Sequence, residues 1–250
     1  MSYTGNMMNI IGKKLLDQIG PGILKTAQFF CSFPCPFCGV KTDGINNFCL
    51  DCLKKLRLVK GTRCPGCGGA LDGVLELCTK CIEFEQRPWE GAFAIFELRG
   101  LGQQVIHRFK FHNSPELARP LAILSKDILS SSNVKFDYIV PVPLHWSRCF
   151  WRGYNQSVLF CEELGRFSDI PCSRMLRRVK RTRQQAKLNR DERRKNLLNA
   201  FDINLKAAVQ GKTILLIDDV MTTGATLSAA ANVLKEKCSA QVYILVIGRR

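Results

Sequence analysis

The sequence predicts an α/β fold, a mostly parallel sheet flanked by helices, preceded by a small cysteine-rich domain with two zinc sites. Three observations predict it. Eight of the 13 cysteines form four C-x2-C pairs confined to residues 35–81. A continuous apolar run, Ile214–Ile217, leads directly into two acids and a threonine-rich turn. A β-branched run, Gln241–Ile247, follows after one helical length, as a right-handed β-α-β unit requires.

The cysteines form an internal repeat. In each half, a C-x2-C pair followed by glycine stands ten residues before a second C-x2-C pair, and every cysteine recurs 29 residues later. Each C-x2-C turn places two sulfur atoms on one side of a knuckle, and two knuckles complete a tetrahedral zinc site with four cysteine ligands. The repeat favours two sequential structural sites over interleaved pairing, and it leaves ribbon or treble-clef geometry open. The predicted ligands are Cys35, Cys38, Cys49 and Cys52 in the first set and Cys64, Cys67, Cys78 and Cys81 in the second.

The remaining cysteines are scattered singly, which separates the cysteine-rich segment from the rest of the chain. We expect an N-terminal helical extension over 1–30, a double zinc-ribbon-like domain over 31–88 and an α/β domain over 89–250. A segment of some 50 residues builds little hydrophobic core by itself, so zinc is expected to replace that core. The α/β domain is expected to begin with a strand over Ala92–Leu98 and a helix over Gly100–Phe111, and Pro115 suits the first turn of a second helix.

Composition and charge narrow the classes of function. The chain begins with no secretory signal, and its apolar runs are far shorter than the roughly 18 residues of a membrane-spanning helix. We therefore expect a cytoplasmic protein without membrane insertion, in which paired cysteines bind metal. The net charge is +16, and eleven basic residues stand against two acids over Arg174–Lys195. Such a field attracts nucleic acid or multiply phosphorylated ligands, although a solvated helix face is the plainer alternative.

The stretch Ile214–Thr226 carries the most specific site pattern. Its apolar half suits a strand buried on both faces, and ligands of open α/β sheets bind where such strands end. Two carboxylates at that end suit hydroxyl groups or a hydrated metal ion. The Thr/Gly turn, which opens a helix expected over Leu227–Cys238, offers backbone N–H groups, hydroxyls and a positive helix end. These features predict a phosphate cradle. A response-regulator receiver is disfavoured because only 31 residues follow Asp219.

The same stretch resembles the signature of type I phosphoribosyltransferases. The resemblance implies that the acids hold the ribose hydroxyls of phosphoribosyl pyrophosphate together with magnesium, while the loop holds the 5′-phosphate. The implied ligand-binding residues are Asp218, Asp219, Thr222, Thr223, Gly224, Ala225 and Thr226, with Asp218 and Asp219 binding magnesium through the ligand.

A second apolar strand, expected over Tyr138–Leu144, runs into a loop that holds arginines, glycine and amides. Arginine forks pair bidentately with phosphate, so this loop suits pyrophosphate, and a plain surface loop is equally consistent with its residues. Segments 141–144, 152–156, 188–196 and 200–201, with the cysteine-rich front, are similar to the ComF family of competence-associated phosphoribosyltransferase-like proteins. The resemblance implies a type I phosphoribosyltransferase fold in which pyrophosphate contacts Pro143, Leu144 and Arg152.

Two functions from different classes remain open. A transferase would displace pyrophosphate from C1 of the ribose by a nitrogen nucleophile, although no residue identifies the acceptor. The family resemblance implies a link to DNA uptake or nucleotide metabolism, and by position Arg178–Asn196 is a candidate lid. The alternative is a non-catalytic, ligand-gated module that binds single-stranded DNA and serves the DNA-uptake machinery. Its candidate DNA contacts are Arg181, Arg183 and Arg190. A zinc scaffold with a vestigial pocket is disfavoured by the intact acids and loop.

Overall fold

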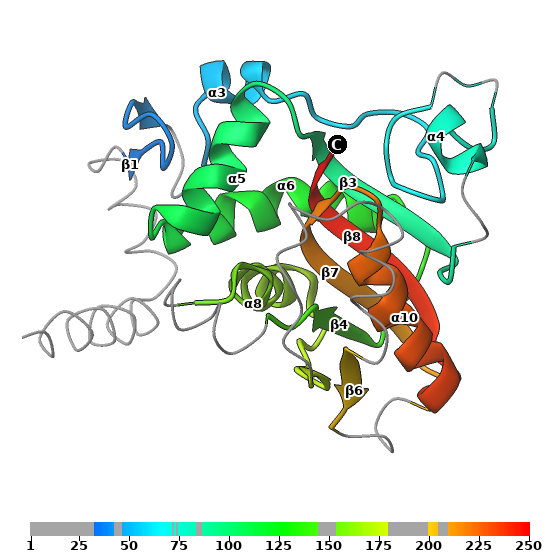
Figure 1. Ribbon diagram of the computed structural model, residues 1–250. Helices are drawn as coiled ribbons and strands as arrows, with labels where there is room; N and C mark the ends of the chain where they lie inside the picture. The colour runs from blue at the N-terminus through cyan, green and yellow to red at the C-terminus, as the bar shows by residue number, and fades with distance from the viewer. Residues whose placement is uncertain are drawn as a thin grey trace, which may run out of the picture. The chain divides into compact units, whose positions relative to one another are not determined.

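The computed structural model in Figure 1 divides into two compact units, Met1–Cys49 and Leu50–Arg250. The second cysteine set therefore belongs to the same unit as the sheet. The division into 1–30, 31–88 and 89–250 stays a prediction, and the N-terminal extension lies outside the described residues. The structure describes residues 33–42, 47–71, 73, 75–83, 87–144, 154–179, 200–204 and 210–250.

The first unit contains one cysteine turn between two very short strands. Strands β1 (Phe33–Pro34) and β2 (Lys41–Thr42) pair antiparallel. Inside the turn, the Cys35 N–H donates to the Val40 carbonyl oxygen at 2.7 Å, and the Gly39 N–H donates to the Cys35 carbonyl oxygen at 2.9 Å. These bonds close the turn that carries the first two cysteines.

A parallel sheet in the order β3-β8-β7-β4 forms the centre of the second unit. Ile214–Ile217 are fully buried, as the continuous apolar run predicts for a strand covered on both faces. All pairings are parallel, so the carboxyl ends of the strands meet at one edge. The strands are β3 (Gly91–Glu97), β4 (Tyr138–Pro141), β7 (Thr213–Met221) and β8 (Gln241–Arg249).

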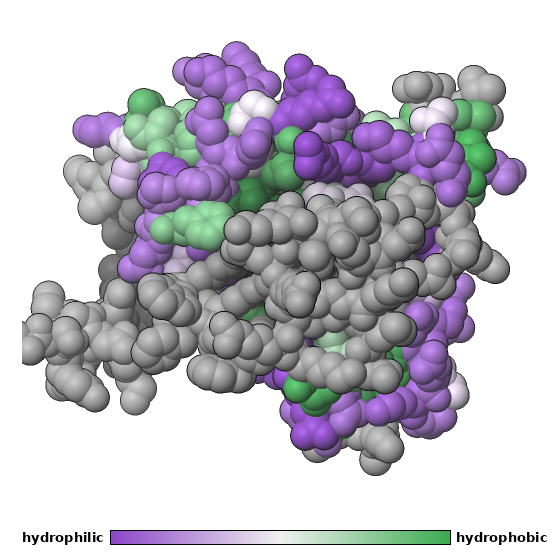
Figure 2. Space-filling model, in the orientation of Figure 1, coloured by the Kyte–Doolittle hydropathy of each residue, from purple (hydrophilic) through white to green (hydrophobic). Residues whose placement is uncertain are grey.

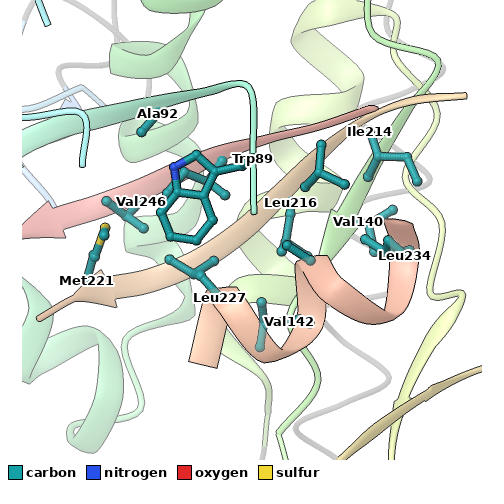
Figure 3. Close-up of a cluster of buried hydrophobic side chains, with 14 of the residues drawn as sticks. Trp89, Ala92, Val140, Val142, Ile214, Leu216, Met221, Leu227, Leu234 and Val246 are labelled. Carbon is teal, nitrogen blue, oxygen red and sulfur yellow. The ribbon is translucent and has the colours of Figure 1, made fainter. Parts of the chain in front are cut away.

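Helices cover the sheet. Buried residues of α10 (Ala225–Cys238) join Ile214 and Leu216 in one hydrophobic cluster, part of which Figure 3 shows with Trp89 beside Leu227. Three further helices also pack on the sheet: α5 (Leu101–Phe111) on β8, α6 (Ala118–Ser130) on β3, and α8 (Gln156–Ser168) on β4 and β7. Helices α6 and α8 also pack on each other. A 3-10 turn, η1 (Pro115–Leu117), leads into α6, as the first-turn proline predicts.

The second cysteine set packs on the same face of the sheet as α10. Cys64, Cys67 and Cys81 lie in the buried cluster that holds Ala92 and Ala94 of β3. The short helices of this region are α3 (Leu50–Lys55) and α4 (Thr79–Ile82). Between them the chain runs along the outer edge of β3.

Edge strand β3 is protected by that segment. Leu58 forms an antiparallel bridge with Phe96, and the Val59 N–H donates to the Ile95 carbonyl oxygen at 2.9 Å. An exposed strand edge invites pairing with other chains, so this cover limits aggregation. The second cysteine set and the sheet are thus one packed body over the described residues of the second unit.

A two-stranded antiparallel ribbon, β5 (Leu176–Arg178) and β6 (Phe201–Ile203), packs against α10. An ion pair between Lys237 Nζ and Asp202 Oδ1, 2.6 Å apart, connects α10 to β6. Most of the candidate lid lies outside the described residues. The chain enters it from β5 and leaves it into β6, so its two ends are held on neighbouring strands.

Several predicted elements are confirmed and two need correction. The strands expected at Ala92–Leu98 and Gln241–Ile247 match β3 and β8. The strand expected over Tyr138–Leu144 ends at Pro141. Strand β7 continues through Met221, because β8 stays paired with it beyond the end of β4. The two acids therefore lie within the strand and not in a following loop. Within the described part of the chain, no helix combines the length and apolarity needed to cross a membrane.

Candidate functional site

Asp218 and Asp219 occupy consecutive positions of β7, so their side chains alternate between the two faces of the sheet. Strand β4 ends where Pro141 pairs with Ile217, and the acids follow directly beyond that point. Asp218 is two residues after Leu216, so its side chain lies on the same face of the sheet, the face that α10 covers. Asp219 lies on the opposite face, where its Oδ1 is 2.8 Å from Lys110 Nζ of α5.

The Lys110–Asp219 ion pair is largely shielded from solvent, with side-chain exposures of 20% and 11%. Two polar side chains at the start of α8 secure the helix that carries Lys110. The Tyr154 hydroxyl donates to the Phe109 carbonyl oxygen at 2.7 Å, and Gln156 Nε2 donates to the same oxygen at 3.2 Å. These bonds fix the end of α5 and with it Lys110. Sequence reasoning missed Lys110, because a lysine in a last helical turn is ordinary.

The two carboxylates differ in their surroundings. Burial and the neighbouring charge of Asp219 raise the pKa of Asp218 to about 7, and Lys110 offsets only part of this. The Asp219 N–H donates to Asp218 Oδ1 at 2.8 Å and fixes that side chain. A cation or hydroxyl donor beside Asp218 would relieve the repulsion, so this carboxylate is suited to a positively charged or hydrogen-bonding ligand.

The threonine-rich turn and the first turn of α10 form a small hollow with Asp218. Gly224 is the N-cap of α10 with φ of 80°, so the helix begins at Ala225, two residues earlier than the sequence predicts. The Ala225 N–H donates to Thr223 Oγ1 at 3.4 Å. The hollow has a volume of about 20 Å³ and is lined by Asp218, Val220 and residues 222–227. The structure therefore brings together one predicted acid and the whole predicted loop.

Arg87 braces this loop from a distant part of the sequence. Its Nη1 donates to the Thr223 carbonyl oxygen at 2.8 Å, and its guanidinium carbon lies 5.3 Å from the centroid of the Trp89 ring. A Cβ on Gly224 would lie 2.8 Å from both Arg87 Nη1 and Met221 Cε. Both atoms end flexible side chains that could shift, so it is the positive φ that favours glycine at this position. Arg87 and Thr223 are 136 positions apart in the sequence, which explains why sequence reasoning did not connect them.

The predicted pyrophosphate loop is described only at its ends. Pro143 and Leu144 are half-buried and follow β4 at the carboxyl edge of the sheet. Asn155 has a structural role: its Oδ1 accepts from the Ser157 N–H at 3.0 Å as the N-cap of α8, and its Nδ2 donates to the Val142 carbonyl oxygen at 3.4 Å. The pyrophosphate contact of Pro143 and Leu144 stays a prediction. Outside the described residues lie Arg152, Arg181, Arg183 and Arg190.

Each cysteine set can hold a zinc ion. The four sulfur atoms of each set lie within 4.8 Å of one another, which confirms the sequential grouping. The Cys38 and Cys49 sulfur atoms are 3.5 Å apart and those of Cys67 and Cys78 are 3.6 Å apart. Tetrahedral Zn–S bonds of about 2.3 Å place sulfur atoms at about this spacing. A hydrogen bond from Cys81 and the nearby Arg249 lower the pKa of Cys67, which favours the thiolate that zinc binds.

Sequence comparisons connect this geometry to known proteins. Residues 155–249 match the family model described as phosphoribosyl transferase domain, which spans α8 to β8. The chain is 36% identical over 152 residues to competence protein F of Haemophilus influenzae, covering 58% of this chain and 66% of that protein. It is 34% identical over 171 residues to DNA utilization protein YhgH of Salmonella typhimurium, covering 65% of this chain and 73% of that protein. It is 35% identical over 149 residues to competence protein ComFC of Bacillus subtilis, covering 58% of each.

Solved structures give more distant matches. One is described as the allosteric regulatory enzyme of purine biosynthesis, with a TM-score of 0.40, 16% identity and coverage of 56% of this chain and 30% of that chain. Adenine phosphoribosyltransferase from Saccharomyces cerevisiae matches with a TM-score of 0.35 and 22% identity, and the match covers 55% of this chain and 72% of that chain. The family match and the observed parallel sheet with flanking helices confirm the predicted phosphoribosyltransferase fold.

Proposed function

The chain belongs to the ComF family of phosphoribosyltransferase-like proteins, and we propose that it binds phosphoribosyl pyrophosphate with magnesium. The observation that carries this proposal is the hollow in which Asp218 meets the turn and first helical residues 222–227. It combines a carboxylate for hydroxyl groups with hydroxyls and backbone N–H groups for a phosphate.

In this proposal the first turn of α10 holds the 5′-phosphate. The N-terminal N–H groups of a helix have no partner within the helix, and the helix dipole adds positive potential there. The hydroxyls of Thr222, Thr223 and Thr226 supply further donors. The Arg87 bond to the Thr223 carbonyl oxygen keeps the turn in the shape that exposes these groups. Asp218, on the same face as the loop, accepts hydrogen bonds from the ribose hydroxyls.

The acidic residues also fit magnesium. Magnesium favours one or two carboxylates combined with substrate phosphates and water. Asp218 lies beside the loop, whereas Asp219 lies on the opposite face of the sheet, where Lys110 already offsets its charge. Asp218 is therefore the carboxylate that gains most from an added cation. When bound, magnesium supplies positive charge to the pyrophosphate oxygens.

If the ribose is transferred, a nitrogen atom of the acceptor bonds to C1 as the C1–O bond breaks. The pyrophosphate leaves with the bonding electron pair. This chain contributes position and charge: Asp218 orients the ribose, the loop fixes the 5′-phosphate, and Pro143, Leu144 and Arg152 contact the leaving group.

Calorimetric titration of the zinc-loaded full chain with phosphoribosyl pyrophosphate and magnesium tests the proposal. We expect wild type to bind and the double variant Asp218→Ala/Asp219→Ala to bind at least about 100-fold more weakly, since it loses several charge-assisted bonds. Asp127→Asn, an exposed acid on α6, is the matched control and is expected to bind like wild type. Absence of binding by wild type would overturn the proposal. Pyrophosphate release over a panel of bases then separates turnover from binding.

The β5–β6 ribbon favours a second, non-catalytic role for the same site. Arg178 pairs with Phe201 across the ribbon and lies near enough to Asp218 to act on its charge. The residues that flank the basic segment 180–199 are therefore close to the ligand hollow. We propose that ligand binding alters the contact of this segment with single-stranded DNA. The affinity of an oligothymidylate should depend on phosphoribosyl pyrophosphate, fall with salt, and decrease in a variant with alanine at Arg181, Arg183 and Arg190. Salt-insensitive binding would contradict this role.

A further inference from the structure

A second cavity lies beside the phosphate loop. It has a volume of about 240 Å³ and shares Thr222 and Thr223 with the smaller hollow. The second cysteine set forms part of its wall through Cys67 and Cys81. Of the residues that line this cavity, the proposed phosphoribosyl site uses only Thr222 and Thr223 as ligand contacts.

Four cationic side chains from three separate segments converge on the cavity. Lys80 comes from α4, Arg87 precedes β3, and Arg249 and Arg250 are at the end of β8. Among the described residues that line the cavity, none is aspartate or glutamate. Figure 2 shows hydrophilic residues gathered between the end of β8 and α4. Like charges held together repel each other, so this arrangement suits an anion that compensates them.

The negative charge of the cysteine thiolates offsets part of the positive charge around the cavity. Arg249 Nη2 lies 3.9 Å from Cys78 Sγ, so that guanidinium is directed towards the second cysteine set. A zinc ion with four thiolates carries two net negative charges, fewer than the four cations around the cavity. Lys80 and Arg250 are exposed and line the cavity, so they are accessible to a ligand from solvent.

We propose that this cavity binds the phosphate group of a nucleotide, either free or within single-stranded DNA. Arginine donates in a fork that matches phosphate oxygens, lysine adds a point charge, and the threonine hydroxyls are further donors. The volume is below the roughly 300–1,000 Å³ of pockets for drug-sized ligands, so it admits one phosphate with part of its sugar or base. The inference rests on the proposed function, because it places a second anionic ligand beside the phosphoribosyl group.

The shared residues couple the two ligands. Arg87 lines the cavity and also donates to the Thr223 carbonyl oxygen in the loop. A phosphate drawn towards Arg87 would therefore act on the loop that holds the 5′-phosphate. Linkage requires that each ligand changes the affinity of the other by the same factor.

The sequence repeat supplies an internal comparison for this site. Lys80, in the fourth knuckle, corresponds 29 residues earlier to Asp51 in the second knuckle. The first cysteine set thus has the opposite charge at the equivalent position. An anion site is expected only beside the second set.

The test is calorimetric titration of the zinc-loaded full chain with thymidine 5′-monophosphate, with uncharged thymidine, and with a single-stranded oligothymidylate. We expect the monophosphate to bind at least about 10-fold more tightly than thymidine. Lys80→Gln and Arg250→Gln should each weaken it about 10-fold, the value of one charge-assisted hydrogen bond. Both variants should bind phosphoribosyl pyrophosphate within about twofold of wild type, because neither side chain lines the smaller hollow. Lys54→Gln, an exposed lysine in the last turn of α3, is the control.

The outcomes separate the two proposals. Binding of the monophosphate identifies a free nucleotide as a sufficient ligand, whereas binding of the oligothymidylate alone identifies DNA only if Lys80→Gln and Arg250→Gln weaken it. If phosphoribosyl pyrophosphate binds and neither nucleotide ligand does, the cavity proposal is wrong and the proposed function stands. If the monophosphate binds and phosphoribosyl pyrophosphate does not, the proposed function is wrong and the cavity proposal stands. If Lys80→Gln and Arg250→Gln weaken the binding of the monophosphate and of phosphoribosyl pyrophosphate equally, the cavity is part of the phosphoribosyl site. That result would overturn the proposal of a separate site.

Discussion

The two cysteine sets share a local geometry. In both turns the first cysteine N–H donates to the carbonyl oxygen five residues on, at 2.7 Å for Cys35 and 2.8 Å for Cys64. The glycines after the turns, Gly39 and Gly68, have φ of 78° and 71°. The repeat in sequence is therefore a repeat in backbone structure.

The surroundings of the two sets differ. Cys64, Cys67 and Cys81 lie in the hydrophobic cluster that also contains the buried residues of α10, and over the described residues that cluster includes no cysteine of the first set. A Cβ added to Gly39 meets nothing within 4 Å, whereas one added to Gly68 would lie 2.4 Å from the Phe93 carbonyl carbon. The same metal-binding pattern thus serves two purposes. In the second set it also covers the sheet and forms one wall of a basic cavity.

Loss of one ligand should separate the sets most clearly. Cys67→Ser removes a zinc ligand with 1% exposure and leaves the remaining thiolates within the core, so we expect a loss of at least about 4 kcal/mol in unfolding free energy. Cys38→Ser, at the equivalent position, should release its zinc but change the unfolding of the sheet by less than about 1 kcal/mol. Urea unfolding followed by circular dichroism, with zinc content by mass spectrometry, measures both. Equal destabilisation would show that the first set is as central as the second.

Substitution of the equivalent glycines, Gly39 and Gly68, keeps every zinc ligand and should give a smaller difference in stability between the two sets. Gly68→Ala combines a positive φ with an overlap against the backbone of β3, so we expect a loss of about 3 kcal/mol. Gly39→Ala has only the strain of its positive φ, about 1 kcal/mol. Chemical unfolding of the two zinc-loaded variants provides the comparison. Similar losses would mean that the contact of Gly68 with Phe93 is relaxed at little cost.

The smallest expected effect is on the zinc affinity of the second cysteine set when its neighbour Arg249 is replaced. Arg249→Met removes the guanidinium beside Cys67 and Cys78, and loss of such outer partners typically weakens metal binding about 10–100-fold. We expect about 10-fold weaker zinc retention at the second set and no change at the first. Competition with a chromogenic chelator measures it, and Arg57→Met, an exposed arginine, is the control. An unchanged affinity would show that Arg249 serves only the cavity.

The local patterns predicted much of the fold. The repeat of cysteines predicted the grouping of the ligands, because an exact repeat favours two sequential sites over an interleaved pairing. The continuous apolar run identified β7, and the threonine-glycine turn identified the presence of α10, although its first residue was placed two positions too late. The extension of β7 through both acids was not predictable, since it depends on pairing with β8, a separate strand.

The composition of the site shows the same limit. Asp218 and the loop from Thr222 to Thr226 lie close together along the chain, so a local pattern is enough to find them. Lys110 and Arg87 reach the site from other parts of the chain and carry no local signal. Tyr154 and Asn155 stand in a motif that suggests ligand contact, whereas in the structure they secure α5 and α8.

The sequence by itself determined which cysteines group into metal-binding sets and where the threonine-glycine turn follows β7, because both depend on residues close together along the chain. Only the tertiary structure decided that the second cysteine set is part of the core and that Lys80, Arg87, Arg249 and Arg250 surround one cavity. Those relations depend on packing between segments, where burial and charge are set by neighbours that no local pattern encodes.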